Sequence, residues 1–399
     1  RVHDDPRATI CVADGRNFLL ASQRQYDVII SEPSNPWMAG LAYLFTKEFY
    51  DLSKQRLARG GIMAQWIQLY RIFPADVKLL LHTFQESFPY MSVWSTIPGD
   101  LVLVGSLEPH QLDYDRLKQQ LAQPSIKQDL DRVSMGHTLA MLESFWLGPE
   151  QVRRLTADVT WIHEDDQPWV EFSAPKALYV DPAFAINYQG LRQLKAPPSV
   201  ISPHLNEEDR DALAYLAVGK AYRYREELEH TTEAFEHAVS LNPDLHEAAV
   251  RLGEVYARRG WSLKAQATLE HATDPSPELM EAYTALARLW KTQGALEQAL
   301  LTYERAARLR APDSPLSEEI GQAFREAKQW AQAAEYFRSA VAQQDGAGRA
   351  SLLVALAESL KELGHTAELE ALLTIASDRH ANQAVFPLML GQLLLEQDR

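Results

Sequence analysis

The sequence predicts an α/β domain followed by an all-α domain, and two observations support this division. In residues 1–106, short apolar runs alternate with helical patterns, as they do in a doubly wound sheet. In residues 211–399, the same residue types return every 34 positions, which indicates stacked helical units. A chain of 399 residues is long enough for two or three domains, each with its own core.

The elements of the first domain are predicted from apolar patterns and end signals. The expected strands are residues 8–13, 26–30, 62–66, 91–96 and 101–106. The expected helices are residues 16–22, 46–57 and 74–88. Thr46 can cap the second helix, Gly60-Gly61 would end it, and Pro74 suits the first turn of the third. Pro98-Gly99-Asp100 would join the last two strands as a hairpin, and Cys11 would lie buried in the first strand.

This order of elements is that of the second half of a Rossmann-like, methyltransferase-type sheet with an antiparallel hairpin at its edge. Such sheets bind ligands outside the carboxyl ends of their strands. Two segments fall there: Asp14-Gly15 after the first expected strand, and residues 31–37 after the second. Residues 1–106 contain no Gly-x-Gly-x-x-Gly loop and start almost at once with a strand, so we expect the chain to be part of a longer protein.

A period of 34 residues runs through the second domain. Gly219 and Gly253 are 34 apart, as are three further pairs: Tyr222 and Tyr256, Ala238 and Ala272, and Pro243 and Pro277. Two more units carry matching residues, among them Leu286, Trp290, Ala299, Gly321, Phe324 and Phe337. Small residues allow the two helices of a unit to approach closely, aromatic residues fill the groove between helices, and proline ends the second helix.

These features resemble the tetratricopeptide repeat (TPR), a unit of two helices. About five units are expected in residues 211–399, the last of them degenerate, with the start of a further pair at residues 388–395. Such arrays present extended concave surfaces, so we expect a protein or peptide partner in the groove. The alternative is a solenoid that only packs against its own N-terminal domain or drives self-association.

Residues 107–200 are interpreted as a helical extension and linker. The clearest helices are expected at residues 114–123 and 138–145, and Pro197, Pro198 and Pro203 mark the domain boundary. We interpret residues 163–166 (His-Glu-Asp-Asp) as a solvated loop, because contiguous residues on regular structure cannot all face one metal ion.

Composition excludes several classes of function. The formal net charge of −15 argues against nucleic-acid binding. No run of apolar residues is long enough to span a membrane. A single cysteine allows neither an internal disulfide nor a cysteine-based metal site, so we expect no metal and a composition compatible with the cytoplasm.

Four segments of the first domain, in their order and spacing, resemble the spermidine synthases, which are polyamine aminopropyltransferases. They are Ala13-Asp14-Gly15 with Phe18-Leu19, Tyr26-Asp27-Val28-Ile29-Ile30, residues 44–50 (LFTKEFY), and Gly60-Gly61-Ile62 with Gln65. The resemblance continues loosely to about Tyr179, where residues 166–172 (DQPWVEF) are similar to a segment of members fused to transmembrane helices. It therefore implies a cytoplasmic domain that a preceding region could tether to a membrane.

The resemblance implies transfer of an aminopropyl group from decarboxylated S-adenosylmethionine to an amine such as putrescine. The family's adenine-binding acid corresponds to Asp14, with Gly15 and Ser31 as further nucleoside contacts. Its catalytic aspartate corresponds to Glu32, which would hold and deprotonate the attacking amine. The remaining positions, all for the amine substrate, are Asn35, Trp37 and Gln65.

Two residues depart from the family's Asp-x-x-Asp-Pro pattern. Glu32 is one methylene longer than the first aspartate, and Asn35 replaces the second, while Pro36 is retained. Asn35 can accept a hydrogen bond but brings no charge, so a dication such as putrescine should bind less tightly. A cation–π contact with Trp37, worth about 1 kcal/mol, would offset part of this loss.

Three functions stay open at this stage. The first is aminopropyl transfer coupled to protein binding by the TPR domain, with no activity expected from this segment alone because it lacks a Gly-rich loop. The second is a catalytically inactive synthase-like scaffold that acts through its repeats. The third is an S-adenosylmethionine-dependent methyltransferase, since that fold shares the sheet and hairpin. In simpler readings, Asp14 only caps a helix and residues 32–37 form an ordinary turn.

Overall fold

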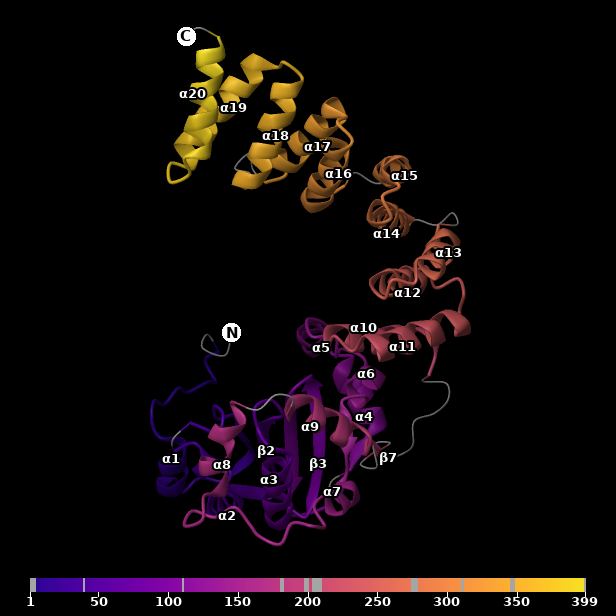
Figure 1. The fold of residues 1–399 in the computed structure, drawn as a ribbon. Helices are drawn as coiled ribbons and strands as arrows, with labels where there is room; N and C mark the ends of the chain where they lie inside the picture. The colour runs from indigo at the N-terminus through magenta and orange to yellow at the C-terminus, as the bar shows by residue number, and fades with distance from the viewer. Residues whose placement is uncertain are drawn as a thin grey trace. The chain divides into compact units, whose positions relative to one another are not determined.

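The structure of the protein is a computed structural model. It describes residues 5–397 apart from 39, 110, 180–182, 197–200, 203–209, 274–278, 310–311 and 345–348. The chain divides into two compact units, Arg1–Ala234 and Phe235–Arg399 (Figure 1). The prolines predicted to mark the domain boundary, together with Pro277, lie outside the described residues. The predicted domain limits at 106, 200 and 211 stay predictions, because a compact unit need not coincide with a sequence domain.

A five-stranded mixed sheet forms the centre of the first unit, in the order β1-β2-β4-β3-β6. The strands are β1 (Tyr26–Ser31), β2 (Leu57–Gln68), β3 (Tyr90–Ile97), β4 (Asp100–Ser106) and β6 (Phe145–Leu147). β1 and β2 are parallel, and the other neighbouring pairs are antiparallel. The predicted Rossmann-like partial sheet and its hairpin, here β3 and β4, are confirmed.

Helices connect these strands, and several of them start where the sequence predicts. The helices are α1 (Gly15–Ala21), the 3-10 helix η2 (Ala42–Leu44), α2 (Lys47–Arg56), α3 (Pro74–Ser87), α4 (Tyr114–Leu121), α5 (Pro124–Asp131), α6 (Thr138–Leu142), α7 (Pro149–Leu155), α8 (Trp169–Ala177) and α9 (Ala183–Arg192). Thr46 accepts a hydrogen bond from the amide of Phe49 and caps α2, and Pro74 occupies the first turn of α3. The short strands β5 (Leu112–Asp113) and β7 (Ile201–Ser202) pair in a separate ribbon.

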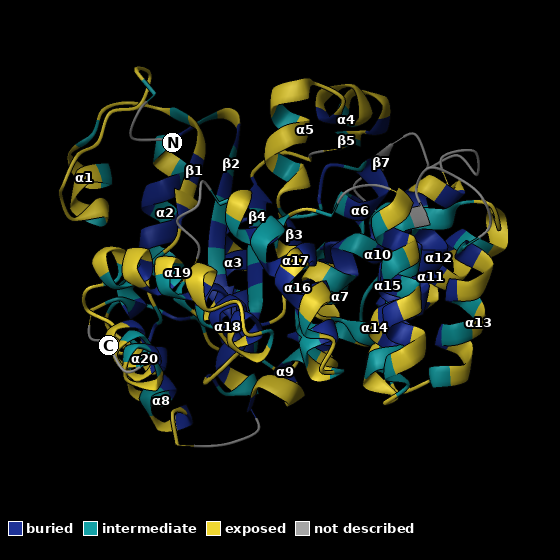
Figure 2. Ribbon diagram, turned by 90° about the horizontal axis from the view of Figure 1, so that it is seen from above, coloured by how far each residue is buried: buried dark blue, intermediate teal, exposed yellow. Residues whose placement is uncertain are grey.

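The core of this unit lies on the sheet face that α2 and α3 cover, and both helices contribute buried residues, which are dark blue in Figure 2. Tyr50 of α2 and Phe84 of α3 are fully buried, with ring centroids 5.2 Å apart in an edge-to-face arrangement. The opposite face is more open at β1, where Val28 is 52% exposed and Ile30 is 73% exposed.

Several expectations for this unit are wrong. Residues 8–13 form no strand, and Cys11 is exposed rather than buried. A strand needs a neighbour for its backbone hydrogen bonds, and none of the described strands pairs with this segment. Gly60-Gly61 does not end a helix but lies inside β2, where Gly60 has a φ of +72° and the register with β1 shifts. Phe145, predicted as helical, starts β6 and pairs with Trp94 of β3.

Helix pairs make up the rest of the chain, which confirms the predicted repeat structure. The helices are α10 (Ala212–Tyr224), α11 (Leu228–Leu241), α12 (His246–Arg258), α13 (Ser262–Ala272), α14 (Leu279–Thr292), α15 (Leu296–Leu309), α16 (Ser314–Glu326), α17 (Trp330–Ala342), α18 (Ala350–Glu362), α19 (Thr366–Arg379) and α20 (Val385–Glu396). α10 belongs to the first unit, and the boundary between the units falls within α11. Where the structure describes the chain, its helices are too short or too polar to cross a membrane.

The small residues of the repeats lie where paired helices come closest. A Cβ at Gly253 of α12 would come within 2.5 Å of Leu269 Cγ in α13. A Cβ at Gly321 of α16 would come within 2.7 Å of Phe337 Cδ1 in α17. These distances are shorter than carbon atoms tolerate, so close helix approach requires glycine at both positions.

Candidate functional site

The carboxyl ends of β1 and β2 bring several predicted site residues to one place. The register pairs Ser31 of β1 with Gln65 of β2. Both side chains are buried, on the same face as the core residue Met63, and the Gln65 amide donates to the carbonyl of Trp66 at 3.1 Å. Glu32 follows Ser31 and is exposed. Since neighbouring residues of a strand alternate, Glu32 belongs to the opposite, open face.

The open face to which Glu32 belongs also carries Trp66 of β2 and Asp100 of β4. Gln68 of β2 pairs with Asp100 of β4, so both side chains lie on the face of Trp66. Trp66 donates a hydrogen bond to the Asp100 carboxylate. Burial raises the pKa of Asp100 above its ordinary value, the Trp66 hydrogen bond opposes this, and the nearby charge of Glu32 raises the pKa further.

The loop after β1 places an amide and an aromatic ring beside Tyr70. The Tyr70 hydroxyl donates a long hydrogen bond of 3.5 Å to Asn35 Oδ1. The rings of Trp37 and Tyr70 meet edge to face, with centroids 6.3 Å apart. Burial raises the pKa of Tyr70, and the charge of Asp100 adds to the effect. Tyr70 therefore lies between the loop that carries Asn35 and the carboxylate of Asp100.

The residues predicted for the nucleoside lie at the start of α1. Asp14 is exposed and accepts a hydrogen bond of 2.7 Å from the amide of Asn17, so it caps this helix. Nothing lies within 4 Å of where a Cβ of Gly15 would be. The capping role considered for Asp14 is therefore present, and the space around Gly15 is open.

Comparison with known proteins identifies this part of the chain. Residues 1–103 match the family described as "Spermine/spermidine synthase domain". The N-terminal part is a spermine/spermidine synthase domain. This synthase domain is 28% identical over 135 residues to the polyamine aminopropyltransferase of Pyrobaculum calidifontis, which covers 31% of this chain and 47% of that protein. It is 47% identical over 60 residues to the polyamine aminopropyltransferase of an Enterobacter species, covering 15% and 20% of the two chains. The chain thus spans less than half the length of these relatives.

Residues 163–166 are not the solvated loop that we expected beside the synthase domain. His163 is fully buried, and its Nε2 lies 3.2 Å from the carbonyl oxygen of Ala42. Burial lowers the pKa of His163 to about 4, so the ring is neutral. Asp165 accepts hydrogen bonds from Thr46 at 2.7 Å and from Arg16 Nη1 at 2.9 Å. The segment therefore ties the start of α1 to the start of α2.

Sequence reasoning did not predict a functional role for three residues of this site. They are Gln68, Tyr70 and Asp100, and Asp100 was assigned to a hairpin turn. The hairpin itself could have indicated Asp100, because the first residue of the returning strand lies at the same sheet edge as the end of the preceding one. Within the part of the chain that the structure describes, no group of three or more His, Cys, Asp or Glu residues is arranged to hold a metal ion.

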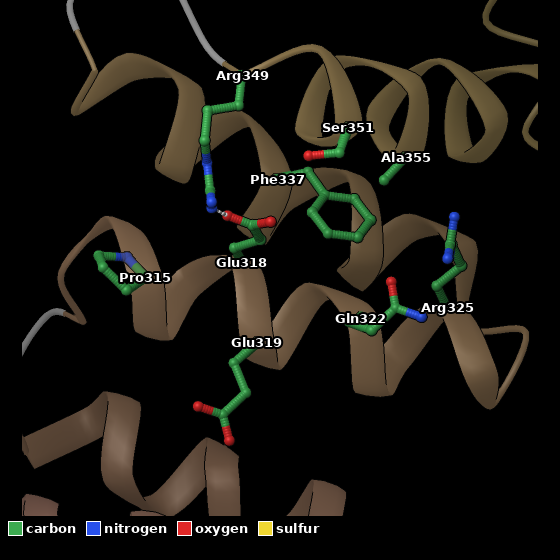
Figure 3. A pocket seen from close by; sticks show the side chains of 9 residues that line it. All are labelled: Pro315, Glu318, Glu319, Gln322, Arg325, Phe337, Arg349, Ser351 and Ala355. Atoms are coloured by element: carbon green, nitrogen blue, oxygen red, sulfur yellow. Dashed lines mark hydrogen bonds and ion pairs between the residues drawn. The ribbon is translucent and has the colours of Figure 1, made fainter. Parts of the chain in front are cut away.

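A second candidate site lies along the first helices of the repeat pairs. Helices α12, α14 and α16 line a pocket of about 310 Å³ that includes Arg251, Arg288 and Glu319. A pocket of about 420 Å³ follows between α16 and α18, with Phe337 between the Arg349–Glu318 ion pair and Arg325 (Figure 3).

Ion pairs join neighbouring first helices along this groove. Arg288 contacts Glu319 at 2.7 Å, and Arg325 contacts Glu358 at 2.5 Å. Hydrogen bonding to Glu319 raises the pKa of Arg288. The groove therefore offers both signs of charge, held in place by neighbouring helices.

Solved structures with a likeness to this chain include several helical repeat proteins. PilW, described as a type IV pilus biogenesis factor, is 20% identical with a TM-score of 0.39, covering 46% of this chain and 84% of PilW. YrrB, described as a TPR protein with an unusual peptide-binding site, is 18% identical with a TM-score of 0.37, covering 47% of this chain and 94% of YrrB. At such scores the likeness adds nothing to the helix pairs seen directly.

Proposed function

We propose that the synthase domain transfers an aminopropyl group from decarboxylated S-adenosylmethionine to an amine, with Glu32 as the acid/base residue. The observation that supports this most is the cluster at the strand ends. Glu32 lies on one sheet face with Trp66 and Asp100, and Tyr70 connects this face to Asn35. Carboxylates surrounded by aromatic rings and an amide suit an ammonium group.

The residues fit the two halves of the reaction unequally. Of the residues proposed for the amine, Glu32, Asn35 and Trp37 follow one another at the end of β1, whereas Gln65 is fully buried on the core face of the sheet and does not join them. Those proposed for the nucleoside, Asp14 and Gly15, are exposed and leave room for it. Ser31, the third residue proposed for the nucleoside, is buried at the end of β1, and its side chain would contact the nucleoside from the core side of the sheet.

Decarboxylated S-adenosylmethionine supplies a propyl carbon activated by its bond to a positively charged sulfur. Glu32 accepts a proton from the amine, whose nitrogen forms the new C–N bond as the C–S bond breaks. The electron pair of that bond stays on sulfur, and methylthioadenosine leaves. Asn35 and Trp37 would hold the amine in line with the breaking bond.

A product assay on the natural full-length protein tests this proposal. Decarboxylated S-adenosylmethionine and S-adenosylmethionine are supplied separately with a panel of amines, and the nucleoside products are followed by mass spectrometry. We expect amine-dependent methylthioadenosine that is lost in Glu32→Gln and kept in Glu150→Gln, a matched change at an exposed glutamate of α7. S-adenosylhomocysteine would favour a methyltransferase instead. Neither product, with no nucleoside binding, would leave the scaffold function.

For the repeats we propose binding of a protein or peptide in the groove of α12, α14, α16 and α18. Two adjoining pockets support this, since Pro315 and Glu319 line both of them. A photoreactive amino acid introduced at Ser351, which lines the larger pocket, should crosslink to a bound partner. The same amino acid introduced at Leu301 should give no crosslink. Leu301 is 58% exposed on α15 and lines neither pocket. Equal labelling from both positions would contradict groove binding.

A further inference from the structure

The amine site of the synthase domain contains a carboxylate that the family's Asp-x-x-Asp-Pro pattern does not include. Asp100 is the first residue of β4 and pairs with Gln68, the last residue of β2. Alternation along β4 places Leu101 and Leu103 in the core and Asp100 on the other face. Glu32 belongs to that same face, and its charge acts on Asp100.

Polar atoms in this position have no partner within the described protein. Asp100 Oδ1 is buried without a hydrogen bond. Gln68 is 1% exposed, and neither its amide oxygen nor its amide nitrogen has a partner. Because Gln68 lies directly across from Asp100, these unpaired atoms gather at one place on the open face. Buried polar atoms without partners are costly, and such groups commonly meet a ligand or a bound water.

The electrostatics select the sign of that ligand. The side chains that act on the charge of Asp100 in the described structure are the donor Trp66 and the carboxylate Glu32, and neither is a cation. The charge of Asp100 in turn raises the pKa of Tyr70. Two carboxylates facing one region without a positive partner repel each other, and this repulsion adds to the pKa of Asp100 that burial already raises. An ammonium at Asp100 would relieve this repulsion and give Asp100 Oδ1 a partner.

We propose that Asp100 binds the distal ammonium of a diamine acceptor and so replaces the charge that Asn35 lacks. This inference rests on the proposed aminopropyl transfer. The reacting nitrogen lies at Glu32, and the second nitrogen is held by Asp100 with the Gln68 amide oxygen. The methylene chain between the two nitrogens packs against Trp66 and Tyr70. This role for Asp100 predicts that monoamines are poor acceptors.

Binding of 1,4-diaminobutane and 1-aminobutane to the full-length protein, in the presence of methylthioadenosine, tests this assignment by calorimetry. Asp100→Asn keeps an oxygen that can accept from Trp66 but removes the charge. Loss of one charge-assisted hydrogen bond should weaken diaminobutane binding by roughly 10- to 100-fold. Binding of aminobutane should change by less than about threefold, because its single nitrogen stays at Glu32.

Two further variants sharpen the result. Asp115→Asn makes the same change at an exposed residue of α4 and should leave both affinities unchanged. Asn35→Asp, added to Asp100→Asn, restores a carboxylate beside Tyr70 and should recover most of the lost diamine affinity. The unchanged aminobutane affinity also shows that Asp100→Asn is folded.

The outcomes separate this inference from the function on which it rests. If Asp100→Asn keeps the wild-type preference for the diamine while Glu32→Gln loses methylthioadenosine formation, the role of Asp100 is refuted and the transferase function stands. If the wild-type protein binds neither amine and forms no methylthioadenosine, both are refuted. Selective loss of diamine binding supports the assignment.

Discussion

Gly321 allows a direct test of the packing that defines the repeats. A Cβ at this position would lie 2.7 Å from Cδ1 and 2.8 Å from Cε1 of Phe337. Phe337 is fully buried and its ring cannot bend, so α16 and α17 have to move apart in Gly321→Ala. Overpacking of this kind costs about 1–3 kcal/mol. Alanine in a helix interior gains about 1 kcal/mol over glycine. The net expectation is a loss of up to about 2 kcal/mol in the free energy of unfolding.

Gly391 provides the matched control for this change. It lies in the interior of α20, and nothing lies within 4 Å of where its Cβ would be. Gly391→Ala should therefore gain up to about 1 kcal/mol from helix propensity alone. For a unit of this size, 1 kcal/mol shifts the melting midpoint by roughly 2–4 °C. Thermal unfolding followed by circular dichroism should show a lower midpoint for Gly321→Ala and a higher one for Gly391→Ala.

The two variants must differ in sign for the reasoning to hold. If Gly321→Ala raises the midpoint as much as Gly391→Ala does, the helices of this pair are not in close contact at Gly321. Glycine at this repeat position would then have no packing role. Amide hydrogen exchange of α16 and α17 would locate the effect, because a packing defect should speed exchange there before it does so in α18 and α19.

Two further predictions concern the first unit. Asp76 is 5% exposed, and burial raises its pKa to about 6. Hydrogen bonds from the Ser173 hydroxyl and the Phe73 backbone, together with the charge of Lys176, lower this pKa but do not cancel the effect of burial. A raised folded pKa means that the folded state holds the proton more tightly. In urea unfolding, the stability of the wild type relative to Asp76→Asn should therefore fall by roughly 2 kcal/mol between pH 4 and pH 6. A difference that stays constant over this range would contradict the prediction. Asp165→Asn leaves Arg16 with a weaker, uncharged partner, so amides of α1 should exchange roughly tenfold faster while those of α3 do not change. Unchanged exchange in α1 would show that other contacts hold this helix.

Much of the fold follows from signals that act over a few residues. Thr46 and Pro74 mark the starts of α2 and α3, because a helix cap depends on neighbours within one turn. The period of 34 predicted the helix pairs, since each repeat contacts mainly its neighbours. Residues 8–13 have a strand-like composition, but a strand also requires a partner that local sequence does not name.

The candidate site likewise contains residues that the sequence predicts and a residue that only the tertiary structure adds. Glu32, Asn35 and Trp37 share one loop, so the sequence by itself determined that these groups lie together at the end of β1. Asp100 joins them only because β4 pairs with β2 in a register that sets it opposite Gln68. A register shifted by one residue would turn Asp100 into the core.

The contact between Arg16 and Asp165 joins residues 149 positions apart and is likewise a tertiary result. The sequence determined the helices, the strands and the chemical groups that they carry. Only the tertiary structure decided which of these groups face one another, because strand register and long-range packing depend on contacts between distant parts of the chain.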